Sequence, residues 1–305
     1  MEFFIEMKRS GDPFTFEPPP KDSSSKETDF SRTLNSAQHL GQFAAYAAAI
    51  LSTQYRTHTF SVLVMKDYAR LIRWDRGGVI FTSPIGYGHL LNFFVRYDEA
   101  DREVCGHDPT VGPATEEEIV LAEKVPELKA AKTAKIPLLT VTIPEEQPSG
   151  PRPRRFVISS PICKLDVPTG RWTRASIALD VSNKRRVLLK DSWRIVHKDI
   201  KPEGELYRIL HEAKVSNISS VELAGDVGSD THHQSQTKEI IPLIPDCGRV
   251  DVIESRLTTH RHYHIVLRTV GRPLESFTST RELVCAIRGA MKGERTIFFI
   301  VSHVT

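Results

Sequence analysis

The stretch Val187-Leu188-Leu189-Lys190-Asp191-Ser192-Trp193 carries most of the information about the fold of this chain. Its apolar start is typical of a buried strand, and a lysine at the end of such a strand can point into a cleft and bridge nucleotide phosphates. The next predicted helix, Glu203–Ala213, offers Glu203 and Glu205 as carboxylate partners that would keep the ammonium charged and in place. A surface lysine beside a solvated helix start is the simpler explanation on periodicity alone, so both interpretations stay open here.

The sequence around this strand alternates β and α patterns, which favours an α+β fold. Strands are predicted at Phe156–Leu165, Arg174–Val181, Arg186–Lys190, Asn217–Leu223 and His262–Val270. The helix Glu203–Ala213 stands between the third and fourth of these strands. A capping box at Ser279–Glu282 predicts a last helix through Met291, with Leu283, Ile287 and Ala290 facing inward.

A smaller α+β region precedes these strands. Its predicted elements are a helix at Ser36–Thr53, strands at His58–Lys66, Ala69–Trp74 and Val79–Thr82, and a helix at Gly86–Tyr97. The aromatic and aliphatic residues of these elements suffice for a core. We therefore expect this region to fold as a module.

Three stretches are predicted to lie outside any core. Residues 1–34 contain proline and serine runs with few apolar groups, which predicts a disordered tail. Glu116–Lys135 alternates the sign of its charges, which predicts a solvated helix. Gln147–Arg155 is rich in proline and arginine and predicts an exposed linker; a basic targeting patch at Arg152, Arg154 and Arg155 is the alternative.

Composition argues against several classes of protein. The 305 residues include 41 basic and 38 acidic ones, and a net charge of +3 is too small to argue for nucleic acid binding. The four cysteines are far apart and match neither a zinc pattern nor a disulfide framework, which favours a reducing compartment. No apolar run reaches the roughly 18 residues of a membrane helix, and the acidic N-terminus is unlike a secretory signal. We expect an intracellular protein of the cytoplasm or nucleus, without a membrane segment.

Three histidines, His260, His262 and His264, alternate along one predicted strand, so their side chains fall on one face. Zinc could use such a set with a fourth ligand from elsewhere. The sequence places no carboxylate or cysteine nearby at a convincing spacing, and we favour ordinary half-buried histidines.

The connection between the first two strands of the larger region contains Gly170-Arg171-Trp172-Thr173-Arg174, where a glycine-rich loop would cover phosphate. Backbone amides of such a loop approach phosphate closely because glycine has no Cβ. Only Gly170 is present here. Arg171 and Arg174 could contact phosphate directly, and an ordinary hairpin turn explains them equally well.

Several blocks resemble the fungal-type protein kinase family, in the family's order, over about Leu34 to Lys292. The blocks are Gly41–Tyr46, Gln54–His58, Ala69–Gly77, Gly106–Val111, Gly170–Arg174, Leu189–Arg194, Pro202–Gly204, His262–Leu267, Val270–Leu274 and Ser279–Leu283. The resemblance implies an α+β fold made of a protein-kinase-like small lobe and the start of a large lobe, preceded by a small α+β region. For complete members it implies ATP-dependent phosphoryl transfer to Ser or Thr.

The resemblance also implies which residues would bind ATP. These are Lys190, Glu203, Glu205, Gly170, Arg171, Thr173, Leu267 and Thr269. Lys190 matches the phosphate-anchoring lysine, with Glu203 as its helix partner and Glu205 as the second choice. The Gly170 segment matches the family's variant phosphate loop, and Leu267–Gly271 matches the hinge that holds adenine.

The expected domains follow from these assignments. They are a tail at 1–34, a family-specific region at 35–115, a charged helix and linker at 116–154, a small lobe and hinge at 155–277, and a first large-lobe helix with an aberrant tail at 278–305.

The motifs of catalysis are missing from these residues. No His-Arg-Asp loop and no Asp-Phe-Gly follows Lys190, so the base and the metal ligands of phosphoryl transfer are lacking. The run Glu294–Val301 departs from the family, and we expect a kinase fragment that is truncated before the catalytic loop and is catalytically inactive. ATP would bind weakly or not at all, and Mg would need the missing large lobe. A nucleotide-binding pseudokinase or a protein-interaction module is the alternative, and the sequence names no substrate or partner.

Overall fold

The computed structural model describes residues 2–14, 26–145, 150, 152–162, 167–228, 231–240 and 257–304, with no side chains described for 26–37, 231 and 294–304. The chain divides into two compact units. Unit 1 consists of Met1–Pro109, Lys164–Trp172 and Ser229–Arg261; unit 2 consists of Thr110–Cys163, Thr173–Gly228 and His262–Thr305.

Unit 1 is built on a four-stranded sheet with the order β1-β2-β3-β4. Strand β1 (Phe4–Met7) pairs in parallel with β2 (His58–Val64), and helix α1 (Lys26–Thr53) lies between them in the chain. Strands β3 (Ala69–Asp75) and β4 (Gly78–Phe81) add antiparallel neighbours, and α2 (Tyr87–Glu99) follows. The predicted helices and strands of this region are confirmed, and α1 begins earlier than expected.

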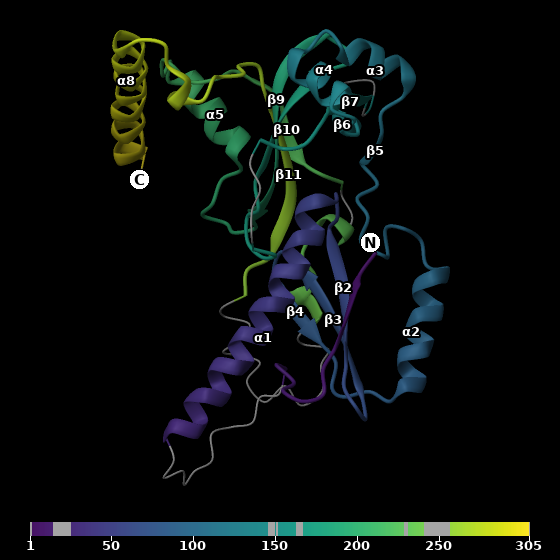
Figure 1. Ribbon diagram of the computed structural model, residues 1–305. Coiled ribbons are helices and arrows are strands. Elements are labelled where there is room, and N and C mark those ends of the chain that lie inside the picture. The colour runs from purple at the N-terminus through teal and green to yellow at the C-terminus, as the bar shows by residue number, and fades with distance from the viewer. Residues whose placement is uncertain are drawn as a thin grey trace. The chain divides into compact units, whose positions relative to one another are not determined.

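Helices α1 and α2 cover opposite faces of the sheet of unit 1 (Figure 1). Side chains alternate along a strand, so Leu63 of β2 faces α1 while its neighbour Val62 faces α2. The α1 side buries a core of Phe4, Phe14, Phe43, Ala47, Ile50, Leu63, Met65, Ile72 and Trp74. The result is a three-layer module in which both faces of the sheet are buried.

The prediction of a disordered tail is wrong for the described part of residues 1–34. Phe4 is 9% exposed and Phe14 is 3% exposed, and both belong to the core against α1. Asp12 forms an ion pair with Arg70, with 2.6 Å between Oδ2 of Asp12 and Nε of Arg70. Phe4 and Phe14 hold this segment in place although they are few. The parallel pairing of β1 with β2 brings the segment onto the core against α1. The proline and serine runs of the prediction lie outside the described residues.

A segment from far along the chain also belongs to unit 1. It contains η1 (Thr231–His233) and α6 (Thr237–Ile240). The carboxylate of Asp75 accepts hydrogen bonds from the backbone N–H groups of Gln236 at 2.8 Å and Thr237 at 3.1 Å, and from the Thr237 hydroxyl at 2.6 Å. Burial opposes ionisation of Asp75, but the charge of Arg73 and these donors hold the pKa of that carboxyl below its usual value.

Unit 2 is built on a seven-stranded sheet with the order β10-β11-β9-β8-β7-β6-β5, in which the pairs β10–β11, β9–β8, β8–β7, β7–β6 and β6–β5 are antiparallel. The strands are β5 (Val111–Pro113), β6 (Leu139–Glu145), β7 (Arg152–Ile158), β8 (Arg174–Asp180), β9 (Arg185–Ile195), β10 (Val221–Asp226) and β11 (His260–Leu267). β7, β8 and β9 form the consecutive antiparallel meander that the sequence predicts.

The charged stretch Glu116–Lys135 is two helices with a buried face, so the prediction of one solvated helix is wrong. α3 (Glu116–Ala122) begins at a capping box made by Thr115 and Glu118, and α4 (Pro126–Thr133) has its proline in the first turn. Ala122, Leu128 and Ala131 pack against Val157 and Leu179 of the sheet. The apolar positions are widely spaced among charged residues, so the sequence pattern did not indicate a buried face.

The described arginines of the predicted linker Gln147–Arg155 are part of the sheet, because Arg152, Arg154 and Arg155 lie in β7. Residues 147–149 and 151 lie outside the described residues. Arg154 lies in β7 with only 5% of its surface exposed. Its guanidinium pairs with Asp180, with Glu222 at 3.2 Å and with Glu145 at 3.1 Å. Three carboxylates around one cation explain how arginine can occupy a buried strand position.

Two further helices belong to unit 2, α5 (Glu203–Glu212) and α8 (Thr280–Val304). α8 starts where predicted, because the Ser279 hydroxyl accepts the N–H of Glu282 at 3.2 Å. It continues past Met291. Leu283 is partly buried, but Ile287 and Ala290 are exposed, so the expectation of an inward face is wrong for these two residues. Within the described ranges, none of the helices combines the length and the apolar character of a membrane span.

Candidate functional site

Lys190 lies in β9, and side-chain alternation places it on the face of the sheet that α5 covers. Leu188, two residues earlier, packs in the same cluster as Tyr207 of α5. The Nζ of Lys190 lies 2.5 Å from Oε1 of Glu203, the first residue of α5, and each side chain is about a quarter exposed (25% and 24%). The ammonium is thus fixed by a carboxylate and still reaches solvent, which suits a group that binds anionic ligands.

The second choice of partner does not contact Lys190. Glu205 pairs instead with Lys201 at 2.6 Å, one helical turn away. This interaction and the hydrogen bond that Lys201 donates hold the pKa of Glu205 below its usual value. Glu205 sits two residues after Glu203, and residues two apart on a helix do not share a face. Helical geometry therefore selects Glu203.

The residues of the expected hinge lie at the end of β11. Leu267 is buried in the cluster with Tyr263 and Ile265, and Thr269 is exposed. The backbone N–H of Arg268 donates to the carbonyl of Ser220 at 2.9 Å, and the N–H of Thr269 donates to the Ser219 hydroxyl at 3.2 Å. The backbone after β11 is thereby tied to the segment that leads into β10.

The Gly170 segment belongs to unit 1 as far as Trp172. The N–H of Gly170 donates to the carbonyl of Arg76 at 2.9 Å, and the Arg76 guanidinium donates to the carbonyl of Pro168 at 3.1 Å. That guanidinium also lies 3.7 Å from the centre of the buried Trp172 ring. Arg171 is exposed and Thr173 is partly buried as the first residue of its block of unit 2. Sequence reasoning missed this role of Arg76, because Pro168 and Trp172 come almost a hundred residues later in the chain.

The opposite face of β9 carries a buried ionic cluster. Asp191 forms an ion pair with Arg174, with 3.0 Å between Oδ2 of Asp191 and Nη2 of Arg174. Its Oδ1 lies 2.6 Å from Nε2 of His262. The His262 ring stacks on Trp193, 4.9 Å between centroids, and meets the His264 ring edge-on. Burial opposes ionisation of Asp191, but the charge of Arg174 and the contact with His262 hold the pKa of its carboxyl well below the usual value.

The cluster bears on the zinc hypothesis. The structure supplies a carboxylate that the sequence spacing did not reveal, since ligand atoms of Asp191, His262 and His264 all lie within 4.8 Å of one another. Two imidazoles and one carboxylate are a donor set that zinc accepts. However, Arg174 and His262 already engage the two oxygens of Asp191. We therefore describe the cluster as a buried hydrogen-bonded network that joins β8, β9 and β11.

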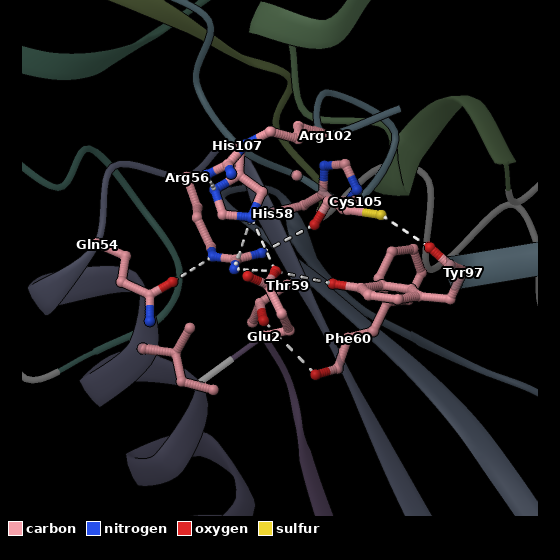
Figure 2. A network of polar contacts seen from close by, with 12 residues as sticks. Glu2, Gln54, Arg56, His58, Thr59, Phe60, Tyr97, Arg102, Cys105 and His107 are labelled. Carbon is pink, nitrogen blue, oxygen red and sulfur yellow. Dashed lines mark hydrogen bonds and ion pairs between the residues drawn. The ribbon is translucent and has the colours of Figure 1, made fainter. Parts of the chain in front are cut away.

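A second polar network lies in unit 1 and is drawn in Figure 2. The fully buried guanidinium of Arg56 pairs with Glu2 at 2.6 Å, contacts Nε2 of His107 at 3.0 Å and donates to the carbonyl of Cys105 at 2.9 Å. Burial opposes ionisation of Glu2, but hydrogen bonds from Arg56 and His107 lower its pKa to about 2. The network joins the start of β1, the start of β2 and the loop after α2.

This loop approaches β2 so closely that one position requires glycine. Gly106 has a φ of +94°, and a Cβ there would lie 2.1 Å from the carbonyl oxygen of His58. Burial lowers the pKa of His58 to about 3, so its ring is neutral at ordinary pH. The block Gly106–Val111, noticed in the sequence for its resemblance, thus begins with a residue that packs the loop against the sheet.

Comparisons with known proteins identify the family. Neither a curated protein nor a solved structure matches the chain. A family model described as fungal protein kinase matches residues 25–301, nearly the whole chain. The match includes most of both units, with Lys190, Glu203 and Arg56, and the chain therefore belongs to the fungal protein kinase family.

Proposed function

We propose that unit 2 is a nucleotide-binding module of the protein kinase type, in which Lys190 binds the phosphates of ATP. The observation that carries the proposal is the ion pair between Lys190 and Glu203 at 2.5 Å. In protein kinases, a strand lysine paired with a helix glutamate contacts the nucleotide phosphates. The chain order of β7, β8, β9, α5, β10 and β11 agrees with the order that the family resemblance leads us to expect in a small lobe.

The electrostatics of the pair favour this role. Glu203 compensates Lys190 for its partial loss of hydration, since only about one quarter of the lysine side chain is exposed. A phosphate can approach the exposed side of the ammonium while Glu203 holds the other side. Leu267 and Thr269 would lie along the base, as the resemblance implies. Thr173 remains a candidate for phosphate contact on the same ground, whereas Gly170 and Arg171 belong to unit 1.

For these 305 residues by themselves we propose nucleotide binding without phosphoryl transfer. They contain neither a His-Arg-Asp nor an Asp-Phe-Gly motif, and these motifs supply the base and the Mg²⁺ ligands of a kinase. Transfer to Ser or Thr is the activity that the family resemblance implies for complete members. A pseudokinase and a kinase fragment both fit this proposal, since each would bind nucleotide through Lys190.

The test is a thermal shift of the whole chain with increasing Mg-ATP. A ligand that binds only the folded state stabilises it by about 2.7 kcal/mol at one hundred times its Kd. We expect the Tm of the wild-type chain to rise with ATP and the rise to disappear in Lys190→Met.

Lys201→Met is the matched control, because Lys201 also pairs with a glutamate of α5 at 2.6 Å but is about half exposed (54%). It should keep the full ATP response. An absence of any shift in the wild-type chain, or an equal shift in Lys190→Met, would contradict the proposal and favour a protein-interaction module.

A further inference from the structure

The helix that carries Glu203 is held to unit 2 by few contacts. None of the side chains of α5 is fully buried, and Leu206 is 46% exposed. Globular proteins normally fix a surface helix by burying an apolar stripe. A groove lined by Arg208, His211 and Leu223 runs along this helix and β10. Contacts at the first turn of α5 therefore have an unusually large part in placing Glu203.

Gly204, the second residue of α5, makes the closest of these contacts. Its N–H donates a hydrogen bond to the hydroxyl oxygen of Tyr263 at 2.9 Å. A Cβ on Gly204 would lie 2.5 Å from the Cβ of Ala224 and 2.6 Å from the hydroxyl oxygen of Tyr263. Real Cβ atoms do not approach other atoms this closely. The helix start thus rests on β10 and β11 at a distance that only glycine permits.

Neither neighbour can yield to a larger residue. The Cβ of Ala224 is attached directly to the backbone of β10, and Tyr263 is only 4% exposed in the cluster with Ile265 and Leu267. A methyl group at position 204 would have to push the first turn of α5 outward by roughly 1 Å to reach ordinary contact distance. Glu203 is the preceding residue and would move with that turn, away from Lys190.

We infer that Gly204 and Tyr263 are positioning residues that hold Glu203 against Lys190 and thereby set the affinity of unit 2 for nucleotide phosphates. The effect on affinity rests on the nucleotide-binding function proposed above, but the effect on the ion pair does not. Gly204 acts by allowing close approach, and Tyr263 acts by accepting the N–H of the first turn. Both act through Glu203.

The first experiment tests the ion pair without nucleotide. A water-soluble carbodiimide activates a carboxylate so that a neighbouring lysine amine forms an amide with it, and peptide mass spectrometry measures the yield of the Lys190–Glu203 product. We expect Gly204→Ala to lower this yield severalfold. Gly225→Ala is the matched control, because Gly225 lies in the neighbouring β10 with nothing within 4 Å of the added Cβ, and its yield should equal that of the wild type.

Folding should not confound the result. Gly204 has no positive φ, and alanine is favoured over glycine within a helix by about 1 kcal/mol, so a weaker ion pair would reflect the contact and not loss of the helix. Combining Gly204→Ala with Ala224→Gly removes the nearest obstructing atom and should restore part of the cross-link, whereas Tyr263→Phe alone removes the acceptor of the Gly204 N–H and should lower the yield. Equal yields in the wild type and Gly204→Ala, or no product in the wild type, would overturn the inference.

The second experiment compares ADP with adenosine. If Glu203 acts on the phosphates, Gly204→Ala should weaken ADP binding about tenfold, which is about 1.4 kcal/mol, and leave adenosine binding unchanged. Equal weakening of both ligands would indicate general damage and overturn the positioning role. If the wild-type chain binds neither ligand but the cross-link depends on Gly204 as expected, the proposed function fails while the positioning of Glu203 stands.

Discussion

Oδ1 of Asp191 lies 2.6 Å from Nε2 of His262, on the face of β9 opposite to Lys190. Adjacent residues of one strand thus have different tasks. Lys190 reaches solvent beside α5, and Asp191 joins β8 and β11 from the buried side through Arg174 and His262. A strand with charges on both faces needs a compensating partner on each, and unit 2 supplies both.

Replacing Asp191 should destabilise unit 2 strongly. Asp191→Asn removes the negative charge that Arg174 and His262 share, and breaking a buried ion pair costs about 3–5 kcal/mol. The measurement is the midpoint of urea unfolding. Asp199→Asn is the control, because the Asp199 side chain is 71% exposed and its loss should shift the midpoint little. Equal midpoints for the two variants would contradict the buried network.

The stability of unit 1 should fall as the pH falls below about 6.5, because of His58. Burial lowers the pKa of His58 from its ordinary value of about 6.5 to about 3. Between these values the unfolded chain binds a proton that the folded chain excludes, so acidification favours unfolding. His58→Gln should flatten this part of the stability curve, measured by urea unfolding from pH 7 to pH 4. An unchanged slope would show that His58 is not the responsible group. The same substitution at the exposed His89 serves as control.

The N-terminal strand should contribute to the stability of unit 1. Phe4 packs in the core, with its ring 5.6 Å from that of Phe43 and 5.4 Å from that of Tyr46. Phe4→Ala should cost about 3–5 kcal/mol, as for other buried phenylalanines. Met7→Ala, at a residue 77% exposed in the same strand, should cost little. A thermal melt that does not distinguish these two variants would support a disordered segment.

Arg154 should be essential to unit 2, and its neighbour in the chain should not. Arg154→Met leaves Asp180, Glu222 and Glu145 without the cation that they surround. The expected loss of stability is about 3–5 kcal/mol, because the buried Asp180 carboxylate is left without its cation, whereas Glu222 keeps Arg268. Arg152→Met, at an exposed position of β7, is the matched control. A linker of the kind predicted from sequence would tolerate both changes equally in chemical denaturation.

The sequence predicted the elements whose residues repeat with a clear period. The helix Ser36–Thr53 and the hairpin around Asp75 were found in this way, since each buries one regular face. The wrong predictions concern segments with few apolar residues, or with apolar residues that stand among many charged ones. In residues 2–14 only a few apolar side chains decide the outcome, and their partner strand lies more than fifty residues away. In Glu116–Lys135 the charged residues outnumber the buried ones that fix α3 and α4.

The candidate site was predictable to the same extent. A lysine on an apolar strand and a glutamate at a helix start are local features, so Lys190 and Glu203 could be named together. The role of Gly204 depends on Ala224 and Tyr263, which come twenty and fifty-nine positions later. Nothing in the sequence near Gly204 indicates that contact. The same holds for Asp191 and His262, which are 71 residues apart in the chain.

The hydrogen bonds from Thr237 to Asp75 have a consequence for how the chain folds during synthesis. The two residues are 162 positions apart, which corresponds to roughly 8–32 s of translation at typical rates. The first hundred or so residues can therefore start to fold as unit 1. Unit 1 is complete only after most of unit 2 has been synthesised. During this interval the Asp75 carboxylate has its local donors, Arg73 and Gly77, but lacks those of Gln236 and Thr237. The early part of unit 1 is therefore without these contacts until the later segment has been synthesised.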